Sequence, residues 1–345
     1  MTLPDGGTRA MYVYTSGYGN SIVTFAFDPV TATLTPKNTP ARVDSPSFLA
    51  WTTPTHEIFA LAELASGRVF GFSVNPATGA LTPVNDVSSG GAGPAHILAD
   101  PTNKWVLVAD YDSDTAAGLG VQPNGMLVAP AAGDIQMLGA SSEAHNFALD
   151  PSNQYAFVAL KGQNAIAQYK FDAPTGKLTA NTPAKQTTSG DPRHIVFHPN
   201  GKFAYVINES ASTMAAFAHD AGKLTEIQAL TTRAAAGGSN ATGVCAVHPS
   251  GKWLYGSNRG DNDIVQYSIN ESDGKMTLVG HTPSSGNTPR HFSLDPSGQF
   301  MFVANQQSNT VVVFRIGPDG KPTQAGMPVS APGAQPTFVG AAVMP

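Results

Sequence analysis

Short hydrophobic runs alternate with polar turn sequences along the whole chain, and no segment shows the 3.6-residue hydrophobic period of an amphipathic helix. The runs are rich in β-branched and aromatic residues, as in 203–207 and 300–303, which favours strands. Between them, Asp295-Pro296-Ser297-Gly298 has the composition of a type I turn, because Asp accepts backbone hydrogen bonds and Pro presets φ. The pattern predicts an all-β protein.

The same layout returns at a nearly fixed spacing. Each unit has an apolar run that ends at a landmark proline, then a turn, then three further short runs, which gives four strands per unit. The landmarks are spaced by 47, 50, 48, 50 and 47 residues, at Thr53-Pro54, Asp100-Pro101, Asp150-Pro151, His198-Pro199, His248-Pro249 and Asp295-Pro296. This period is typical of propeller blades, and 345 residues hold seven of them. We expect one domain over residues 1–345, a seven-bladed β-propeller of four-stranded antiparallel blades.

The first blade lacks an inner strand at its own end of the chain. Residues 11–14 match the second strand of later units, with no landmark strand before them. Residues 336–339 (Pro-Thr-Phe-Val) resemble 46–49 (Pro-Ser-Phe-Leu), which begin the inner strand of the second blade. We therefore expect residues 336–343 to complete a composite first blade with residues 11–36. Such closure removes the open edges of the ring.

Composition narrows the function classes. Charged residues make up 12% of the chain, against about 25% in an average globular protein. The 41% of apolar residues is enough to form a large core, and the net charge of -5 offers no electrostatic basis for binding nucleic acid. The single cysteine, Cys245, excludes a disulfide scaffold and a CxxC site. Without an apolar run of signal-peptide or membrane-span length, we expect a cytoplasmic protein with no membrane contact; the sequence gives no oligomeric state.

The propeller topology indicates where a site lies. In each blade the start of the first strand and the end of the second share one face near the central channel, while the landmark turns lie on the opposite face. His198 and His248 are therefore interpreted as turn residues. The channel face is expected to collect residues five and six positions before the landmarks, together with second-strand ends that we place at Gly17, Glu63, Asp110, Leu160, Glu209, Arg259 and Gln306.

These positions are enriched in the residue types that bind and transform anions. They hold three of the eight arginines and four of the nine histidines of the chain. In a chain so poor in charge, this convergence at one channel mouth is the strongest signal for a binding site. The candidate site residues are His96, His145, Arg193, His194, Glu209, Arg259, Arg290, His291 and Gln306.

Structural roles compete with these assignments. The asparagines that end second strands, such as Asn208 and Asn258, are interpreted as bonding loop backbone. Glu209 could form an ion pair with Arg193 or Arg259 between blades, and His96 and His291 could bridge adjacent blades. No His-x-His or HExxH spacing is present, so no metal is expected.

Residues 191–209, Asp-Pro-Arg-His-Ile-Val-Phe-His-Pro-Asn-Gly-Lys-Phe-Ala-Tyr-Val-Ile-Asn-Glu, closely resemble the signature blade of the seven-bladed propeller lactonases. This family contains bacterial 6-phosphogluconolactonase and fungal 3-carboxy-cis,cis-muconate lactonising enzyme. Residues 257–260 and 289–292 match as well, and the likeness covers essentially the full chain. The resemblance to the muconate branch implies a catalytic His, Arg, Glu and second Arg, which match His145, Arg193, Glu209 and Arg259.

One segment departs from the pattern of these relatives. Where they commonly carry Asp-Leu-Gly-x-Asp, residues 159–164 are Ala-Leu-Lys-Gly-Gln-Asn, so two acidic residues are lost and a lysine is gained.

The chemistry that we favour is hydrolysis of a small anionic lactone, such as 6-phosphogluconolactone, without a cofactor. No nucleophile elbow or Ser-His-Asp pattern points to covalent catalysis, so direct attack by water is the simpler hypothesis. Glu209 or His145 would act as the general base, and Arg193 and Arg259 would stabilise the oxyanion and bind anionic groups. The residues expected to bind substrate around them are His96, His194, Arg290, His291 and Gln306.

Two alternatives remain open from the sequence. In a lactone-forming cycloisomerase, His145 or Glu209 would protonate carbon while a carboxylate of the substrate attacks its own double bond. In a non-catalytic binding platform, the channel mouth would be blocked or apolar, in contrast to the Arg, His and Glu expected there.

Overall fold

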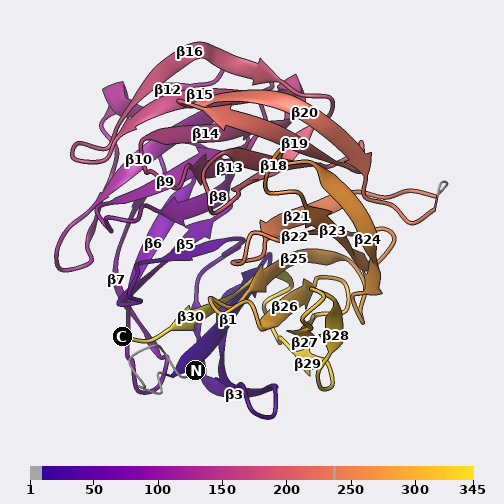
Figure 1. The fold of residues 1–345 in the computed structure, drawn as a ribbon. Coiled ribbons are helices and arrows are strands. Elements are labelled where there is room, and N and C mark those ends of the chain that lie inside the picture. The colour runs from indigo at the N-terminus through magenta and orange to yellow at the C-terminus, as the bar shows by residue number, and fades with distance from the viewer. Residues whose placement is uncertain (1–9, 236–237) are drawn as a thin grey trace.

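Seven small antiparallel sheets follow one another around a ring in the computed structural model, which describes residues 10–235 and 238–345 (Figure 1). In six of the sheets the strands follow chain order, whereas in the first the last strand of the chain lies beside the first; the first strands of neighbouring blades contact one another. The predicted seven-bladed β-propeller is confirmed.

The first strands face the channel. From blade 1 to blade 7 they are β30 (Pro336–Val343), β4 (Leu49–Trp51), β8 (Pro94–Ala99), β13 (Ala144–Leu149), β17 (Pro192–Phe197), β21 (Thr242–Val247) and β25 (Pro289–Leu294). The second strands are β1 (Met11–Gly17), β5 (Glu57–Ala62), β9 (Trp105–Asp110), β14 (Tyr155–Leu160), β18 (Phe203–Asn208), β22 (Trp253–Asn258) and β26 (Phe300–Asn305).

The third and outer strands complete each blade. The third strands are β2 (Ser21–Asp28), β6 (Arg68–Val74), β10 (Thr115–Val121), β15 (Ala165–Asp172), β19 (Thr213–Asp220), β23 (Asp263–Ile269) and β27 (Thr310–Ile316). Five blades have one outer strand: β3 (Thr33–Arg42), β7 (Leu81–Ser88), β16 (Lys177–Thr187), β20 (Lys223–Thr231) and β24 (Met276–Pro283). In blades 3 and 7 the outer strand is split, into β11 (Leu127–Val128) with β12 (Gln136–Met137) and β28 (Pro322–Gln324) with β29 (Val329–Ser330). Two 3₁₀ turns, η1 (Ala132–Asp134) and η2 (Lys161–Gln163), are the helical elements of the described residues.

The C-terminal strand closes the ring. β30 pairs antiparallel with β1, from Met11 opposite Val343 to Ser16 opposite Phe338. The sheet order is β3-β2-β1-β30, as expected from the likeness of residues 336–339 to 46–49. The outer strand of this blade runs to Arg42, six residues beyond the expected limit at residue 36.

The core lies between the blades. A tyrosine of the second strand reaches into the next blade in three places: the hydroxyls of Tyr14, Tyr205 and Tyr255 donate to the carbonyls of Gly79, Gly274 and Gly320. Gly274 has φ +73°, and a Cβ on it would lie 2.3 Å from the Phe203 ring. A glycine is needed there because the turn packs directly on that ring.

The turns on the far face have the expected structural roles. Asp295 accepts the amide of Ser297 at 3.0 Å and that of Phe300 at 2.7 Å. His198 accepts the amide of Asn200 through Nδ1, and its Nε2 lies 2.9 Å from the carbonyl oxygen of Gly251 in the next blade. His248 makes the equivalent bridge to Gly298 at 2.9 Å. The prediction that these histidines are turn residues is confirmed.

Candidate active site

A pocket of about 670 Å³, open to solvent, lies where the blades converge. Its lining comes from three sets of equivalent positions, one residue from each contributing blade. The rim positions directly follow a second strand and are occupied by Tyr18, Glu63, Tyr111, Lys161 and Glu209. The bulge positions lie at the start of the first strand and are occupied by Ser47, Ala95, His145, Arg193, Arg290 and Thr337. The plug positions come one residue later, and Phe48, His194 and His291 line the pocket from there.

The bulge positions owe their direction to the backbone. The pairing of β17 with β18 skips Arg193, because Pro192 is opposite Asn208 and His194 is opposite Ile207. The same register shift skips His145 in blade 4 and Arg290 in blade 7. Side chains alternate between the two faces of a regular strand, and a bulge re-aims the extra residue. Consecutive residues such as Arg193 and His194 can therefore both line the pocket.

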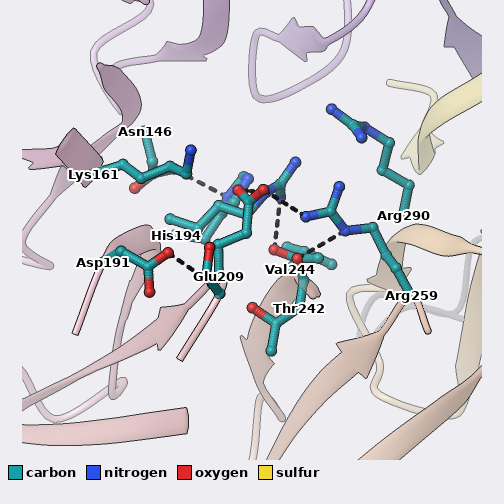
Figure 2. Close-up of polar contacts among 12 residues, drawn as sticks. Asn146, Lys161, Asp191, His194, Glu209, Thr242, Val244, Arg259 and Arg290 are labelled. Carbon is teal, nitrogen blue, oxygen red and sulfur yellow. Dashed lines mark hydrogen bonds and ion pairs between the residues drawn. The ribbon is translucent and has the colours of Figure 1, made fainter. Parts of the chain in front are cut away.

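Arg193, Glu209 and Arg259 form an ionic group in which Arg193 is buried and the other two are half-buried. Figure 2 shows Glu209 and Arg259 of this group. Nε of Arg193 lies 3.1 Å from Oε2 of Glu209, and Nη2 of Arg259 lies 2.8 Å from Oε1. Each arginine also donates to a backbone carbonyl of β21, Arg193 to Gly243 at 2.6 Å and Arg259 to Thr242 at 2.9 Å. The Glu209–Arg193 pair lies within blade 5, whereas the Glu209–Arg259 pair joins blades 5 and 6.

The pKa values of Glu209 and Arg193 are both lowered, which favours the charged carboxylate but disfavours the charged guanidinium. Burial raises the pKa of Glu209, but the charges of Arg193 and Arg259 outweigh it and hold that pKa below its ordinary value. Burial, together with repulsion from Arg259, lowers the pKa of Arg193 to about 9. Glu209 is therefore a carboxylate at neutral pH, with both oxygens occupied by guanidinium groups.

His145 is a neutral imidazole with an unused nitrogen. Its side chain is buried, and Nδ1 has no hydrogen-bond partner among the described residues. Burial, followed by the positive charges of Arg193 and Arg290, lowers the pKa of His145 well below its ordinary value. The ring lies edge-on to Tyr111, with 5.9 Å between the centroids. His145 lines the pocket, so its neutral ring is placed to take a proton from water bound there.

Two further groups of residues at the pocket wall have the same hydrogen-bond arrangement, in which a tyrosine hydroxyl links a cationic side chain to a glutamate. In the first, Nζ of Lys161 lies 3.1 Å from the Tyr111 hydroxyl and 3.0 Å from Glu143, and the Tyr111 hydroxyl donates to Glu143 at 2.6 Å. Burial lowers the pKa of Lys161, but its bonds to Tyr111 and Glu143 outweigh burial and raise that pKa above its ordinary value. Lys161 is therefore a fixed positive charge in the wall.

In the second group, Nη2 of Arg290 donates to the Tyr18 hydroxyl at 2.8 Å, and Tyr18 donates to Glu63 at 3.2 Å. The guanidinium also lies over the Tyr18 ring, 5.1 Å from its centroid. Lys161, Arg193 and Arg259 each pair with a glutamate, whereas Arg290 has no carboxylate within ion-pair distance in the described part of the chain.

The plug positions close the channel below the pocket. The Phe48 ring contacts three imidazoles, with centroid distances of 4.3 Å to His96, 5.1 Å to His291 and 5.9 Å to His194. Phe48 and His194 also line an apolar cavity of about 650 Å³ that includes Cys245. These rings therefore separate the polar pocket from the apolar interior of the channel.

His96 and His291 bridge adjacent blades. Nδ1 of His96 accepts the amide of Phe147 at 3.3 Å, and Nδ1 of His291 accepts that of Val339 at 3.3 Å. At the equivalent position of blade 4, Oδ1 of Asn146 accepts the amide of Ile195 at 3.1 Å. Burial lowers the pKa of both histidines to about 3.

The structure gathers most of the predicted site residues but not all of them. His145, Arg193, His194, Glu209, Arg290 and His291 line the pocket. Arg259 lies behind Glu209, and His96 belongs to the plug. Gln306 occupies the rim position of blade 7 but does not line the pocket.

Among the titratable residues that line the pocket, sequence reasoning missed four: Tyr18, Glu63, Tyr111 and Lys161. Glu63 was placed at a strand end without a role. In blades 1, 3 and 4 the rim position was placed one residue too early, at Gly17, Asp110 and Leu160, each of which is the last residue of its strand. Counting one residue further, as for Glu209, would have found the two tyrosines and the lysine.

Within the described residues, no group of three or more His, Cys, Asp or Glu side chains is arranged to hold a metal ion. Among the same residues, no helix is long and apolar enough to cross a membrane.

A seven-bladed propeller with a cationic pocket above a plugged channel is the class of protein that this fold and site define. Residues 10–339 match the family model described as lactonase, 7-bladed beta-propeller. The chain belongs to this lactonase family.

Individual relatives agree with this assignment. A 6-phosphogluconolactonase of Formosa agariphila is 35% identical over 263 residues, which cover 72% of this chain and 74% of the relative. A 6-phosphogluconolactonase of Bacillus subtilis is 28% identical over 313 residues, covering 87% and 88%. The solved structure of a periplasmic gluconolactonase of Pseudomonas aeruginosa superposes with a TM-score of 0.88 at 24% identity, covering 97% of this chain and 100% of that one, and supports the fold.

Proposed function

We propose that this protein hydrolyses a small anionic lactone, such as 6-phosphogluconolactone, in the pocket around His145 and Arg193. The observation that carries the proposal is that Arg290, which has no carboxylate partner among the described residues, lines the same pocket as the paired cations Lys161 and Arg193. A phosphate or carboxylate on the substrate would supply the missing partner, and a guanidinium binds such groups with two parallel hydrogen bonds.

The names of the relatives favour hydrolysis over the two alternatives. Both sequence relatives described above are named 6-phosphogluconolactonases, and the family is a lactonase family. A cycloisomerase or a non-catalytic platform has no comparable support. The cytoplasmic location expected from the sequence stays a prediction.

Of the two candidate bases, His145 suits the role better. Both oxygens of Glu209 are held by arginines, and its lowered pKa makes it a weak base. Nδ1 of the neutral His145 has no partner among the described residues, and burial, followed by the positive charges of Arg193 and Arg290, lowers its pKa. An anionic substrate would offset these charges and so raise the basicity of His145 when it binds.

The proposed reaction is a direct attack by water. His145 removes a proton from water, the resulting hydroxide adds to the lactone carbonyl carbon, and Arg193 stabilises the oxyanion. The bond from this carbon to the ring oxygen then breaks, and the ring oxygen takes up a proton. Glu209 and Arg259 act as positioning residues, because they fix the direction of the Arg193 side chain.

The experiment that tests this function measures proton release at constant pH by purified protein with 6-phosphogluconolactone and with uncharged gluconolactone, each corrected for spontaneous hydrolysis. We expect a larger kcat/KM for the phosphorylated lactone and a loss of about 10²-fold or more in kcat for His145→Gln. A muconate absorbance assay run alongside checks for the cycloisomerase reaction. Absence of hydrolysis of every lactone, with His145→Gln and Arg193→Ala behaving as the parent protein does, would overturn the proposal.

A further inference from the structure

Glu63 differs from the other glutamates of the pocket. Glu209 and Glu143 each have a Lys or Arg nitrogen within 3.1 Å, whereas Glu63 has no ion-pair partner among the described residues. Glu63 accepts a hydrogen bond from the Tyr18 hydroxyl at 3.2 Å. Glu63 lines the same pocket as His145 and Arg193.

The surroundings of Glu63 raise its pKa. Burial raises the pKa of this carboxyl above its ordinary value, and the hydroxyl groups of Ser47 and Tyr18 and the charges of Arg290 and Arg193 offset only part of that effect. Its polar neighbours Ser47 and Tyr18 come from the starts of blades 2 and 1. The pocket therefore contains two carboxyl groups whose environments move their pKa values apart, upward for Glu63 and downward for Glu209. Such pairs are typical of sites in which one carboxyl group donates a proton and the other stays ionised.

The proposed reaction has a step that needs a donor. When the lactone ring opens, the leaving group is an alkoxide, which is a much stronger base than the carboxylate formed with it. Arg193, Arg290 and Lys161 are held as cations that bind anions. The donor must reach the ring oxygen from the pocket wall and lose its proton readily.

We propose that Glu63 is the general acid of this site, donating its carboxyl proton to the ring oxygen of the lactone as the bond from that oxygen to the carbonyl carbon breaks. This inference rests on the proposed lactone hydrolysis. The proton balance closes over a full turnover: His145 takes one proton from water, Glu63 gives one to the leaving oxygen, and the proton on His145 returns to Glu63 through solvent. The net reaction adds one water to the ester. Tyr18 is a positioning residue, because its hydroxyl holds Glu63 and is itself held by Arg290.

The test is the Glu63→Gln variant, which keeps an oxygen that can accept from Tyr18 but has no proton to donate at the carboxyl position. With 6-phosphogluconolactone we expect kcat to fall by about 10²-fold or more while KM stays within threefold. The fall of kcat at high pH, where the parent enzyme loses the Glu63 proton, should disappear in the variant. Glu63→Asp, which keeps an acid with a shorter reach, should recover part of kcat.

Two outcomes would overturn the assignment: a kcat for Glu63→Gln within threefold of the parent value, or a high-pH fall of kcat that persists in the variant. Glu271→Gln, at an exposed position between β23 and β24, is the matched control and should change neither parameter. Thermal unfolding of every variant separates a loss of chemistry from a loss of folding. Tyr18→Phe is a second variant, which removes the hydrogen bond to Glu63 but keeps its carboxyl group. If the parent protein hydrolyses no lactone, the proposed function itself fails; if it hydrolyses lactone and Glu63→Gln does so equally well, only the role of Glu63 fails.

Discussion

The guanidinium of Arg193 and the carboxylate of Glu209 meet at 3.1 Å, 16 residues apart in the chain, at the ends of two paired strands of one blade. The Arg193 side chain is 5% exposed and that of Glu209 is 18% exposed. Removing one partner of such a buried pair leaves an uncompensated charge, which is more damaging than replacing both partners.

We therefore predict that Glu209→Gln lowers the free energy of unfolding by about 3 kcal/mol, as well as abolishing most of the activity. Combining it with Arg193→Met should recover part of the stability but none of the activity. Urea unfolding of the single and double variants measures the difference. Fully additive losses would show that the two side chains do not stabilise one another.

Arg290→Gln tests the recognition of the substrate anion. Because Arg290 has no carboxylate partner in the described structure, its loss should weaken binding with little effect on folding. We expect KM for 6-phosphogluconolactone to rise by at least about tenfold, corresponding to about 1.4 kcal/mol of binding free energy, with a smaller change for uncharged gluconolactone. Arg315→Gln, an exposed arginine that contacts the carbonyls of Pro29 and Val30, is the matched control. Equal effects on both lactones would contradict a role in anion binding.

Stability should fall in acid because of the plug histidines. The pKa values of His96 and His291 are lowered from 6.5 to about 3 by burial. Between these pH values the unfolded chain binds protons that the folded chain does not, so the free energy of unfolding decreases as pH falls from about 6.5 toward 3. Each imidazole contributes up to about 1.4 kcal/mol per pH unit.

The substitutions His96→Asn and His291→Asn should make this acid dependence shallower. Asn146 already bridges two blades at the equivalent position, so the variants keep an acceptor for the amide of the next blade. Urea unfolding at pH 7, 6, 5 and 4 measures the slope, and His56→Asn at an exposed position serves as control. An unchanged slope in the double variant would mean that other groups determine acid stability.

The closing strand should be essential for the whole ring. Deleting residues 336–345 removes the partner of β1 and exposes the edge of that strand. We expect the truncated chain to lose its cooperative thermal transition, as followed by circular dichroism. A circular permutant that joins the two ends and opens the chain between Ser272 and Asp273, in the exposed β23–β24 turn, keeps every strand and should fold. A truncated protein that melts at the parent temperature would contradict this account of closure.

The repeat alone was sufficient to predict the architecture, because the landmark prolines recur at nearly fixed spacing in six of the seven blades. It also placed His145, Arg193 and Glu209 at one face. It could not show that Arg193 is skipped by the strand pairing, since a bulge depends on the geometry of two strands together. The repeat also could not show that Arg259 pairs with Glu209 outside the pocket lining while Arg290 lines the pocket. The position of a residue along a strand fixes the face on which its side chain lies, but not the residue with which it pairs.

The contacts of Phe48 with the three imidazoles have a kinetic consequence. Because the channel is closed beneath the pocket, the described structure offers one route in and out of it. The ring-opened acid has to leave through the mouth by which the next lactone enters, and it carries one more negative charge than the lactone did. In a pocket lined by Lys161, Arg193 and Arg290, acid that accumulates competes with the lactone for the same cations, so we expect the product to inhibit turnover.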